Sequence, residues 1–412
     1  MKKIAEDKKR LLSNFFSLSL IKISSMILPL VTLPYLVSVL GIENFGLISF
    51  VLSIIMYFDI FVSFGFELSA TRQISVNRDN IEKVSEIFSS VMVIKFLFLM
   101  ISFLLLSLII LLFDNIRTHA ALYYVTFGVV VGNALFPIWF FQGIERMKYI
   151  TYFTLSTKVF FTLFVFIVVH EQNDYIYVPL LTSIGAIVGG VISIWVVLKY
   201  FSVQFFWPSK EVVNSYIIDS YQFFLSRVAN QGGEYYAITM IGIYFGNTVV
   251  GYYSMIDKLL MAFTSLGGLV AQTIYPYMTK TQNVSMFKKI FILVVSMSIV
   301  ILFPVMFFRD MIIELVFRLQ DALLSDMFLI MFSGSIFGII NALIGYPLLA
   351  ALGYVQHANN SLIIASVFNV AYITLVVVVM KSIYLAAFSI IVFNLFSVLL
   401  RSYYINKTKI LR

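Results

Sequence analysis

The sequence predicts an all-α polytopic membrane protein of about twelve transmembrane helices, arranged as two six-helix bundles without a soluble domain. Hydrophobic residues make up 61% of the 412 residues and charged residues only 12%, whereas soluble domains carry about 25% charge. Apolar runs long enough for a bilayer crossing, which needs roughly 20 residues, recur along the whole chain. These runs lack the alternation of a β-barrel, and helices satisfy their own backbone hydrogen bonds in lipid.

The expected spans follow one another with short connections that leave little room for another domain. They lie at approximately 11–40, 44–68, 85–113, 119–142, 149–169, 175–198, 215–245, 248–276, 287–308, 323–351, 359–380 and 382–402. The chain has no cysteine, which excludes disulfides and thiolate chemistry.

Basic residues indicate the orientation of the spans. Most of those in the expected connections fall on one side: the N-terminus, Arg72, Arg78, Lys83, Arg146, Lys148, Lys199, Lys210, Lys280, Lys288, Lys289, Arg401, Lys407, Lys409 and Arg412. The other side has Arg117, Arg309, Arg318 and Lys381. Positive residues stay cytoplasmic, so we expect both termini in the cytoplasm and an even number of helices. The basic loops then set topology and contact anionic membrane lipids, not nucleic acid.

Matching markers in the two halves indicate an internal repeat. The segment that begins at Leu40 and Gly41 matches the one that begins at Phe245 and Gly246. Further matches at a similar offset are Lys22 with Arg227, Pro137 with Pro347 and Gly143 with Gly353. We expect Gly41 and Gly246 to form tight turns, because glycine tolerates positive φ.

The repeat predicts six-helix bundles at residues 1–205 and 206–412, related by a parallel pseudo-two-fold axis along the membrane normal. Transporters built this way bind substrate between their halves and alternate access by rocking. An old duplication that serves only as a scaffold is the alternative.

Charged side chains inside the expected spans mark a candidate site, because charge is costly in the bilayer and usually faces a cavity or an opposite charge. The cations are Lys22, Lys95, Lys158, Arg227 and Lys258, and the acids are Asp59, Glu234 and Asp257. Lys22 and Arg227 each belong to a polar helix face. The hypothesis is a positively lined central cavity that binds an anion such as a phosphate. The alternative is structural pairing, of Arg227 with Glu234 and of Lys258 with Asp59 or Asp257.

The acids Asp59, Glu234 and Asp257 are candidates for coupling transport to a proton or another cation, with structural ion pairing as the alternative. Pro29 and Pro34 interrupt the first helix, and Gly232 and Gly233 interrupt the seventh. Proline and paired glycines weaken a helix. We predict hinge points there, or else static kinks.

The remaining motifs argue against an enzyme. His119, His170 and His357 are scattered near span ends, the outer loops are short, and the nucleotide-binding and Ser/His/Asp signatures are absent from the sequence. We therefore expect no catalytic residues, no metal and no cofactor, and a gradient as the energy source.

Several segments resemble a known family. They are ILPLVTLPYLVSVLGIENFGLISF with the Asp59 region and GFELSATRQIS, PIWFFQGIERMKY at the fourth span, and GYYSMIDKL at the eighth. These are similar to the Wzx O-antigen flippases of the MOP (multidrug, oligosaccharidyl-lipid and polysaccharide) exporter superfamily. The resemblance implies a MATE-like fold and flipping of undecaprenyl-pyrophosphate-linked O-antigen or capsule repeat units across the bacterial inner membrane.

The resemblance also implies that Lys22 and Arg227 meet the pyrophosphate, and that the polymerase and chain-length regulator of the same pathway are partners of a functional monomer. Cation antiport through Asp59 and Asp257 is a further implication. A MATE-type multidrug antiporter is the alternative, although its cationic drugs favour an acidic cavity. A membrane-embedded O-antigen polymerase is the second alternative, against which the repeat and the short outer loops argue.

Overall fold

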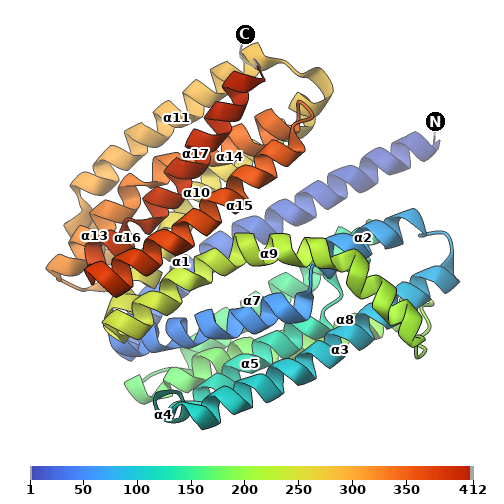
Figure 1. Ribbon diagram of the computed structural model, residues 1–412, viewed down its shortest axis with the longest axis horizontal. Coiled ribbons are helices and arrows are strands. Elements are labelled where there is room, and N and C mark those ends of the chain that lie inside the picture. Colours follow the sequence, from blue (N-terminus) through green and yellow to red (C-terminus); the bar gives the residue numbers. More distant parts are fainter. Residues whose placement is uncertain (1, 409–412) are drawn as a thin grey trace. The chain divides into compact units, whose positions relative to one another are not determined.

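The computed structural model describes the backbone of residues 2–408, and their side chains from Leu20 onward except those of Lys22 and Asn230. Every regular element in this part of the chain is a helix (Figure 1). The helices form two compact units. Unit 1 comprises Met1–Leu28 and Phe50–Tyr235, and unit 2 comprises Pro29–Ser49 and Tyr236–Arg412.

Helix α1 contributes to both units, and α9 begins in unit 1 and ends in unit 2. The elements up to α9 are α1 (Lys2–Ser63), α2 (Phe66–Val76), α3 (Ile81–Leu112), α4 (Asp114–Arg117), α5 (Ala120–Leu135), α6 (Ile138–Gly143), α7 (Met147–Val168), the 3₁₀ turn η1 (Gln172–Ile176), α8 (Tyr177–Tyr200) and α9 (Lys210–Phe245).

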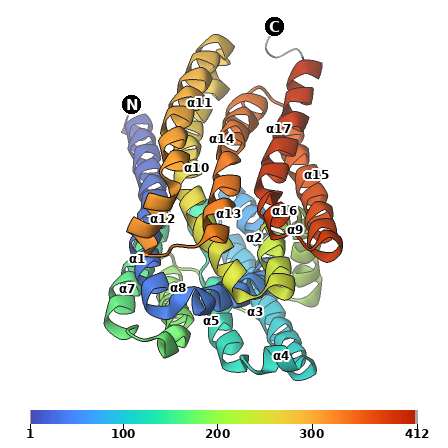
Figure 2. The same cartoon turned by 90° about the vertical axis from the view of Figure 1, so that its left-hand side faces the viewer.

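The remaining helices all belong to unit 2 (Figure 2). They are α10 (Asn247–Thr281), α11 (Val284–Phe307), α12 (Arg309–Phe317), α13 (Ala322–Ser333), α14 (Ser335–Ile344), the π-helical turn η2 (Gly345–Ala350), α15 (Val355–Thr374), the π-helical turn η3 (Leu375–Met380), α16 (Ile383–Ala387) and α17 (Ser389–Lys407).

The compact units do not follow the predicted division at residue 205. The first part of α9 packs with unit 1, and residues 29–49 of α1 pack with unit 2. The sequence repeat and the two compact units therefore divide the chain at different residues. The two-bundle division at 1–205 and 206–412 stays a prediction.

Ten helices in the described chain are long and apolar enough to cross a membrane, which agrees with a multi-pass membrane protein. The first of these segments, Ile23–Val76, is 54 residues long, more than twice the length that one crossing needs. Helix α9 has 36 residues with five charged side chains. A total of twelve crossings is consistent with these two segments but remains a prediction.

The two predicted tight turns are confirmed. Gly41 interrupts α1 with φ 77° and ψ 163°, and Gly246 precedes α10 with φ 84° and ψ 176°. Residues with a Cβ atom rarely adopt these backbone angles, so glycine is needed at both positions. Two residues matched by sequence alone thus share nearly the same unusual backbone geometry.

The helices that follow these turns cross at a second pair of matched glycines within unit 2. A Cβ atom on Gly46 would lie 1.8 Å from the Asn247 carbonyl oxygen, and one on Gly251 would lie 2.5 Å from the Ile42 carbonyl oxygen. Gly251 and Asn247 are the repeat equivalents of Gly46 and Ile42, so the two contacts mirror each other. Small residues allow such close backbone approach between helices in membranes.

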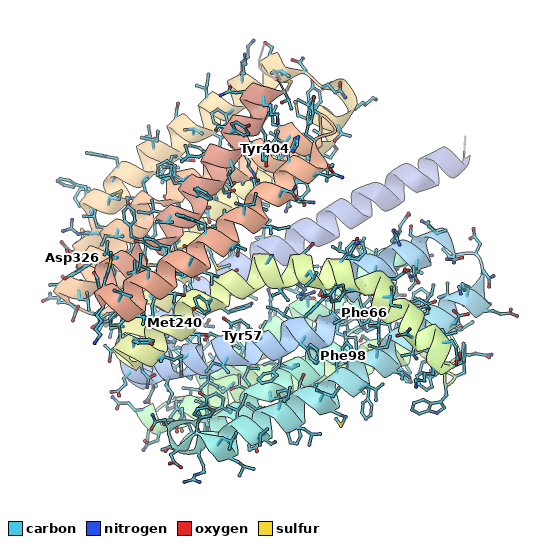
Figure 3. The ribbon with its side chains drawn as sticks, viewed as in Figure 1. Tyr57, Phe66, Phe98, Met240, Asp326 and Tyr404 are labelled. Atoms are coloured by element: carbon cyan, nitrogen blue, oxygen red, sulfur yellow. The ribbon has the colours of Figure 1, made fainter. Side chains whose placement is uncertain are left out.

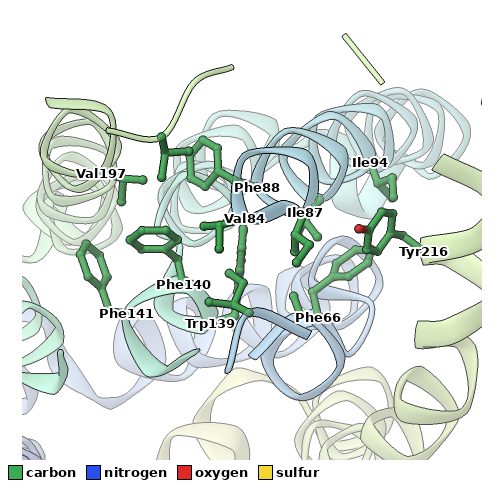
Figure 4. Packing of buried hydrophobic residues seen from close by; sticks show 14 of the residues in the cluster. Phe66, Val84, Ile87, Phe88, Ile94, Trp139, Phe140, Phe141, Val197 and Tyr216 are labelled. Atoms are coloured by element: carbon green, nitrogen blue, oxygen red, sulfur yellow. The ribbon is translucent and has the colours of Figure 1, made fainter. Parts of the chain in front are cut away.

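An aromatic core holds α2, α3, α6 and the first part of α9 together in unit 1 (Figure 4). Trp139, Phe140 and Phe88 are each about 1% exposed, and the Phe88 ring contacts those of both Trp139 and Phe140. Tyr216 of α9 joins the core and donates its hydroxyl proton to Glu86 of α3 at 3.1 Å. The core therefore fixes this part of α9 against the helices that carry the candidate site.

Arg401 does not lie in a loop, contrary to the sequence prediction. It was expected among the basic residues of the C-terminal connection, but it lies inside α17 and is 3% exposed. Its guanidinium donates to Ser361 Oγ at 2.9 Å, to Asn341 Oδ1 at 2.6 Å and to the Ala358 carbonyl at 3.1 Å. A buried cation needs such partners, so Arg401 ties α17 to α14 and α15.

Candidate functional site

The candidate site is a cavity of about 240 Å³ within unit 1. It lies where the second part of α1 meets α2, α3, α5, α6 and α9. Its polar lining residues are Asp59, Ser63, Glu67, Lys95, Asn133 and Arg227, and its apolar lining residues are Met56, Phe66, Phe136, Ile138 and Trp139. Two acids and two bases thus line one cavity.

Arg227 joins α9 to the two acids. Its guanidinium lies 2.9 Å from Glu67 Oε2 and 3.8 Å from Asp59 Oδ2. It also donates to the Gln231 side-chain oxygen at 2.9 Å, one helical turn further along α9. The Arg227 side chain is 14% exposed and that of Glu67 is 43% exposed. The Arg227–Glu67 pair therefore forms the accessible edge of the cluster.

Asp59 forms the inner part of the cluster and is 4% exposed. Its Oδ1 accepts a hydrogen bond of 3.0 Å from the Asn133 side-chain amide. The positive charges of Arg227 and Lys95 interact with it from α9 and α3. These contacts compensate the cost of burying a carboxylate, which is several kcal/mol per ion.

Lys95 of α3 is equally buried, and its ammonium donates to the backbone carbonyl of Asn133 at 3.0 Å. That carbonyl is free of a helical partner because the residue four positions on is Pro137, which has no N–H group. Helix α5 accordingly ends at Leu135. One residue, Asn133, thus contacts the acid through its side chain and the base through its backbone.

Lys158 lies apart from this cluster, in a second cavity of unit 1. That cavity has a volume of about 390 Å³ and is lined by α5, α7 and α8, with Thr154, Thr157 and Thr182 beside Lys158. The Lys158 ammonium donates to the Ser25 hydroxyl of α1. Asn133 lines both cavities, so it forms part of the wall between them.

Of the other predicted charges whose side chains are described, Lys258, Glu234 and Asp257 line neither cavity. Lys258 and Glu234 are exposed in α10 and α9, and Asp257 is half-buried. The Lys22 side chain lies outside the described residues. The structure therefore brings together Asp59, Lys95 and Arg227 of the predicted set, and Arg227 pairs with Glu67 and Asp59 where Glu234 was the alternative.

The predicted hinge residues lie next to the points where the chain passes between the compact units. Pro29 is the first residue of unit 2, and Gly232 and Gly233 come just before the boundary after Tyr235. The Tyr57 hydroxyl of α1 (Figure 3) donates to the Gly232 carbonyl at 3.4 Å. Helix α1 remains helical through Pro29 and Pro34 and has non-helical angles at Gly41. Hinge motion at these residues stays a prediction.

Sequence reasoning missed two residues that contact the charged side chains of the site, Glu67 and Asn133. Glu67 was overlooked because it lies at the start of α2, near an expected span end. Asn133 was overlooked because an amide carries no charge, although its position four residues before Pro137 marks a free carbonyl. Among the described residues, no group of three His, Asp or Glu side chains is arranged to hold a metal ion.

Known proteins share this sequence pattern and this fold. Residues 11–282 match the family model described as "Polysaccharide biosynthesis protein". A "Putative O-antigen transporter" of Escherichia coli strain K12 is 29% identical over 71% of this chain and 70% of its own length. A protein of the same description from Shigella dysenteriae is 28% identical over 66% of this chain and 68% of its own length.

Two solved structures have the same helical arrangement at low sequence identity. The "Lipid II flippase MurJ" in an inward closed conformation has a TM-score of 0.73 and 13% identity, covering 96% of this chain and 87% of that one. An inward-facing multidrug resistance MATE family transporter of the MOP superfamily has a TM-score of 0.64 and 12% identity, covering 95% and 97%. The predicted MOP-type fold is thereby confirmed, and the chain belongs to the polysaccharide biosynthesis protein family.

Proposed function

We propose that the protein flips lipid-linked oligosaccharide repeat units across the bacterial inner membrane by alternating access. The observation that carries the proposal is the buried Arg227 cluster, in a chain whose family is polysaccharide biosynthesis and whose relatives are described as O-antigen transporters. An undecaprenyl-pyrophosphate carrier has a doubly charged group that must pass a region without water. An arginine that can form paired hydrogen bonds with phosphate suits that task.

The two acids beside Arg227 take separate roles in this proposal. Glu67 is the exposed partner of Arg227 and acts as the anion that the pyrophosphate displaces. Asp59 is the buried partner and couples the exchange to a cation gradient, because a proton or cation on Asp59 weakens its hold on Arg227. A drug antiporter would need an acid that is available to its cationic substrate, whereas Glu67 is paired with Arg227 and the Asp59 carboxylate is buried and bonded to Asn133.

The remaining parts of the proposal concern the cellular setting. The distribution of Lys and Arg favours cytoplasmic termini. Membership of this family supports a location in the inner membrane. The proposed partners of the monomeric protein are the O-antigen polymerase and the chain-length regulator. Alternating access would use the hinge points at Pro29, Pro34, Gly232 and Gly233.

Removal of the Arg227 side chain tests the proposal directly. In proteoliposomes that contain an undecaprenyl-pyrophosphate-linked repeat unit, we expect Arg227→Ala to lower the flipping rate roughly 10- to 100-fold, because hydrogen bonds to charged groups contribute about 1.5–3 kcal/mol. Arg227→Lys keeps the charge but not the paired geometry and should be intermediate. Arg117→Ala, in an exposed pair with Asp114 in α4, is the matched control. An Arg227→Ala protein that flips at the wild-type rate excludes this role.

The role of Glu67 predicts an effect of the opposite sign. Glu67→Gln removes the competing anion and should lower the KM for the lipid-linked substrate about two- to five-fold, the range of an exposed ion pair. Initial flipping rates against substrate concentration measure it, with Glu82→Gln at the exposed start of α3 as the control. A raised KM would instead mean that Glu67 holds Arg227 in its binding position.

A further inference from the structure

The connection between α8 and α9 exposes three large aromatic side chains in a row. Residues 201–209 are irregular, and within them Phe205 is 47% exposed, Phe206 42% and Trp207 77%. The rings of Phe205 and Trp207 lie edge to face with their centroids 5.8 Å apart. An exposed apolar surface of this kind marks contact with another molecule or with a membrane.

Two serines of α3 hold the backbone of this connection. The Gln204 N–H donates to Ser85 Oγ at 3.1 Å, and the Phe206 N–H donates to Ser89 Oγ at 3.2 Å. The Ser89 hydroxyl in turn donates to the Gln204 carbonyl at 3.4 Å. The two serines are four residues apart, on one face of α3, and both are buried. Their hydroxyls supply the partners that irregular backbone needs when it lies against lipid.

Basic and aromatic residues alternate on either side of the connection. At the end of α8, the Lys199 ammonium lies 4.5 Å from the centre of the Trp195 ring and 5.7 Å from that of Tyr200. Both rings are more than one-third exposed, and Lys210 is exposed at the start of α9. Trp and Tyr collect at the headgroup level of a bilayer, where phosphates attract lysine. The charge and the ring types therefore match a phospholipid surface.

We infer that residues 203–207 form a membrane-interface anchor. Phe205, Phe206 and Trp207 insert into the phospholipid headgroup region, while Ser85 and Ser89 hold the backbone of the segment against α3. The anchor fixes the depth in the bilayer at which the chain passes from α8 to α9.

The depth of Trp207 in the bilayer tests this inference. The full-length wild type and Trp207→Phe are reconstituted in phosphatidylcholine–phosphatidylglycerol vesicles whose acyl chains carry bromine, a quencher of tryptophan emission. Trp139 and Trp195 are present in both proteins, so the difference in emission belongs to Trp207. We expect the largest loss of Trp207 emission with bromine near the headgroups, a smaller loss with bromine at the chain ends, and little quenching by iodide in the water.

A serine variant tests how the anchor is held. Ser85→Ala/Ser89→Ala removes three hydrogen bonds to the segment, so the freed backbone groups favour water. We expect Trp207 emission in this variant to shift to longer wavelength, with more quenching by iodide and less by bromine. Ser107→Ala is the matched control, because the Ser107 hydroxyl donates to the Phe103 carbonyl of α3 itself.

Two results for the wild type would overturn the anchor. Trp207 emission that iodide quenches and bromine does not would place the segment in water, available to a protein partner. Strongest quenching at the chain ends would place it below the headgroups. Unchanged Trp207 emission in the double serine variant would remove the role of the serines. If that variant does not insert, Ser85→Ala and Ser89→Ala, which lose one and two of the bonds, decide the same point.

Discussion

Gly46→Ala and Gly251→Ala are expected to be among the most damaging single substitutions in unit 2, although each adds one methyl group. The added carbon of Gly46→Ala would lie 1.8 Å from a backbone oxygen, and that of Gly251→Ala 2.5 Å from another. Backbone cannot move aside as a flexible side chain can, so α1 and α10 must separate. Overpacking costs about 1–3 kcal/mol and occasionally more, and we expect the upper end of that range or beyond.

The matched control is Gly185→Ala in α8, where the nearest atom to the added carbon is at 3.5 Å. Alanine favours a helix over glycine by about 0.5–1 kcal/mol, so the control should be neutral or slightly stabilised. The two effects thus have opposite signs for the same chemical change. Thermal unfolding in detergent and the yield of monodisperse protein measure both. Equal stability of Gly46→Ala and Gly185→Ala would contradict the close crossing.

The turn glycines show how far the sequence could predict this fold. Gly41 and Gly246 were identified because a tight reversal in the membrane requires positive φ, which only glycine adopts readily. The all-helical class was predictable because it depends on the composition and length of the apolar runs and not on how the helices pack. Arg401 was assigned to a terminal connection because its burial depends on Ser361 and Asn341, which lie on other helices.

The candidate site was predictable only in part. Charge inside a span identified Asp59, Lys95 and Arg227 one at a time, since each is costly in lipid. Their meeting in one cavity depends on how α1, α3 and α9 pack, which no local pattern specifies. The first part of α9 packs with unit 1, so Arg227 meets Asp59 of α1 and Glu67 of α2.

Asp59→Leu should both destabilise the protein and abolish flipping. The substitution removes the buried counter-charge of Lys95 and Arg227 and the acceptor of the Asn133 amide. Removal of one partner from a buried pair costs about 3–5 kcal/mol, because the remaining charge is left uncompensated. Asp59→Asn preserves the size of the side chain and should be less destabilised, but it can no longer exchange a cation and should flip at a strongly reduced rate.

A double variant distinguishes lost charge compensation from lost packing. If Asp59 stabilises the protein by neutralising Lys95, then Asp59→Leu/Lys95→Met removes both charges and should be more stable than Asp59→Leu alone. The interaction energy of residues in one charge network is typically 0.5–3 kcal/mol in such a cycle. Tm values of the wild type, both single variants and the double variant complete the cycle. Strict additivity of the two substitutions would show that Asp59 and Lys95 do not compensate each other, and the cluster would then be only a set of neighbouring charges.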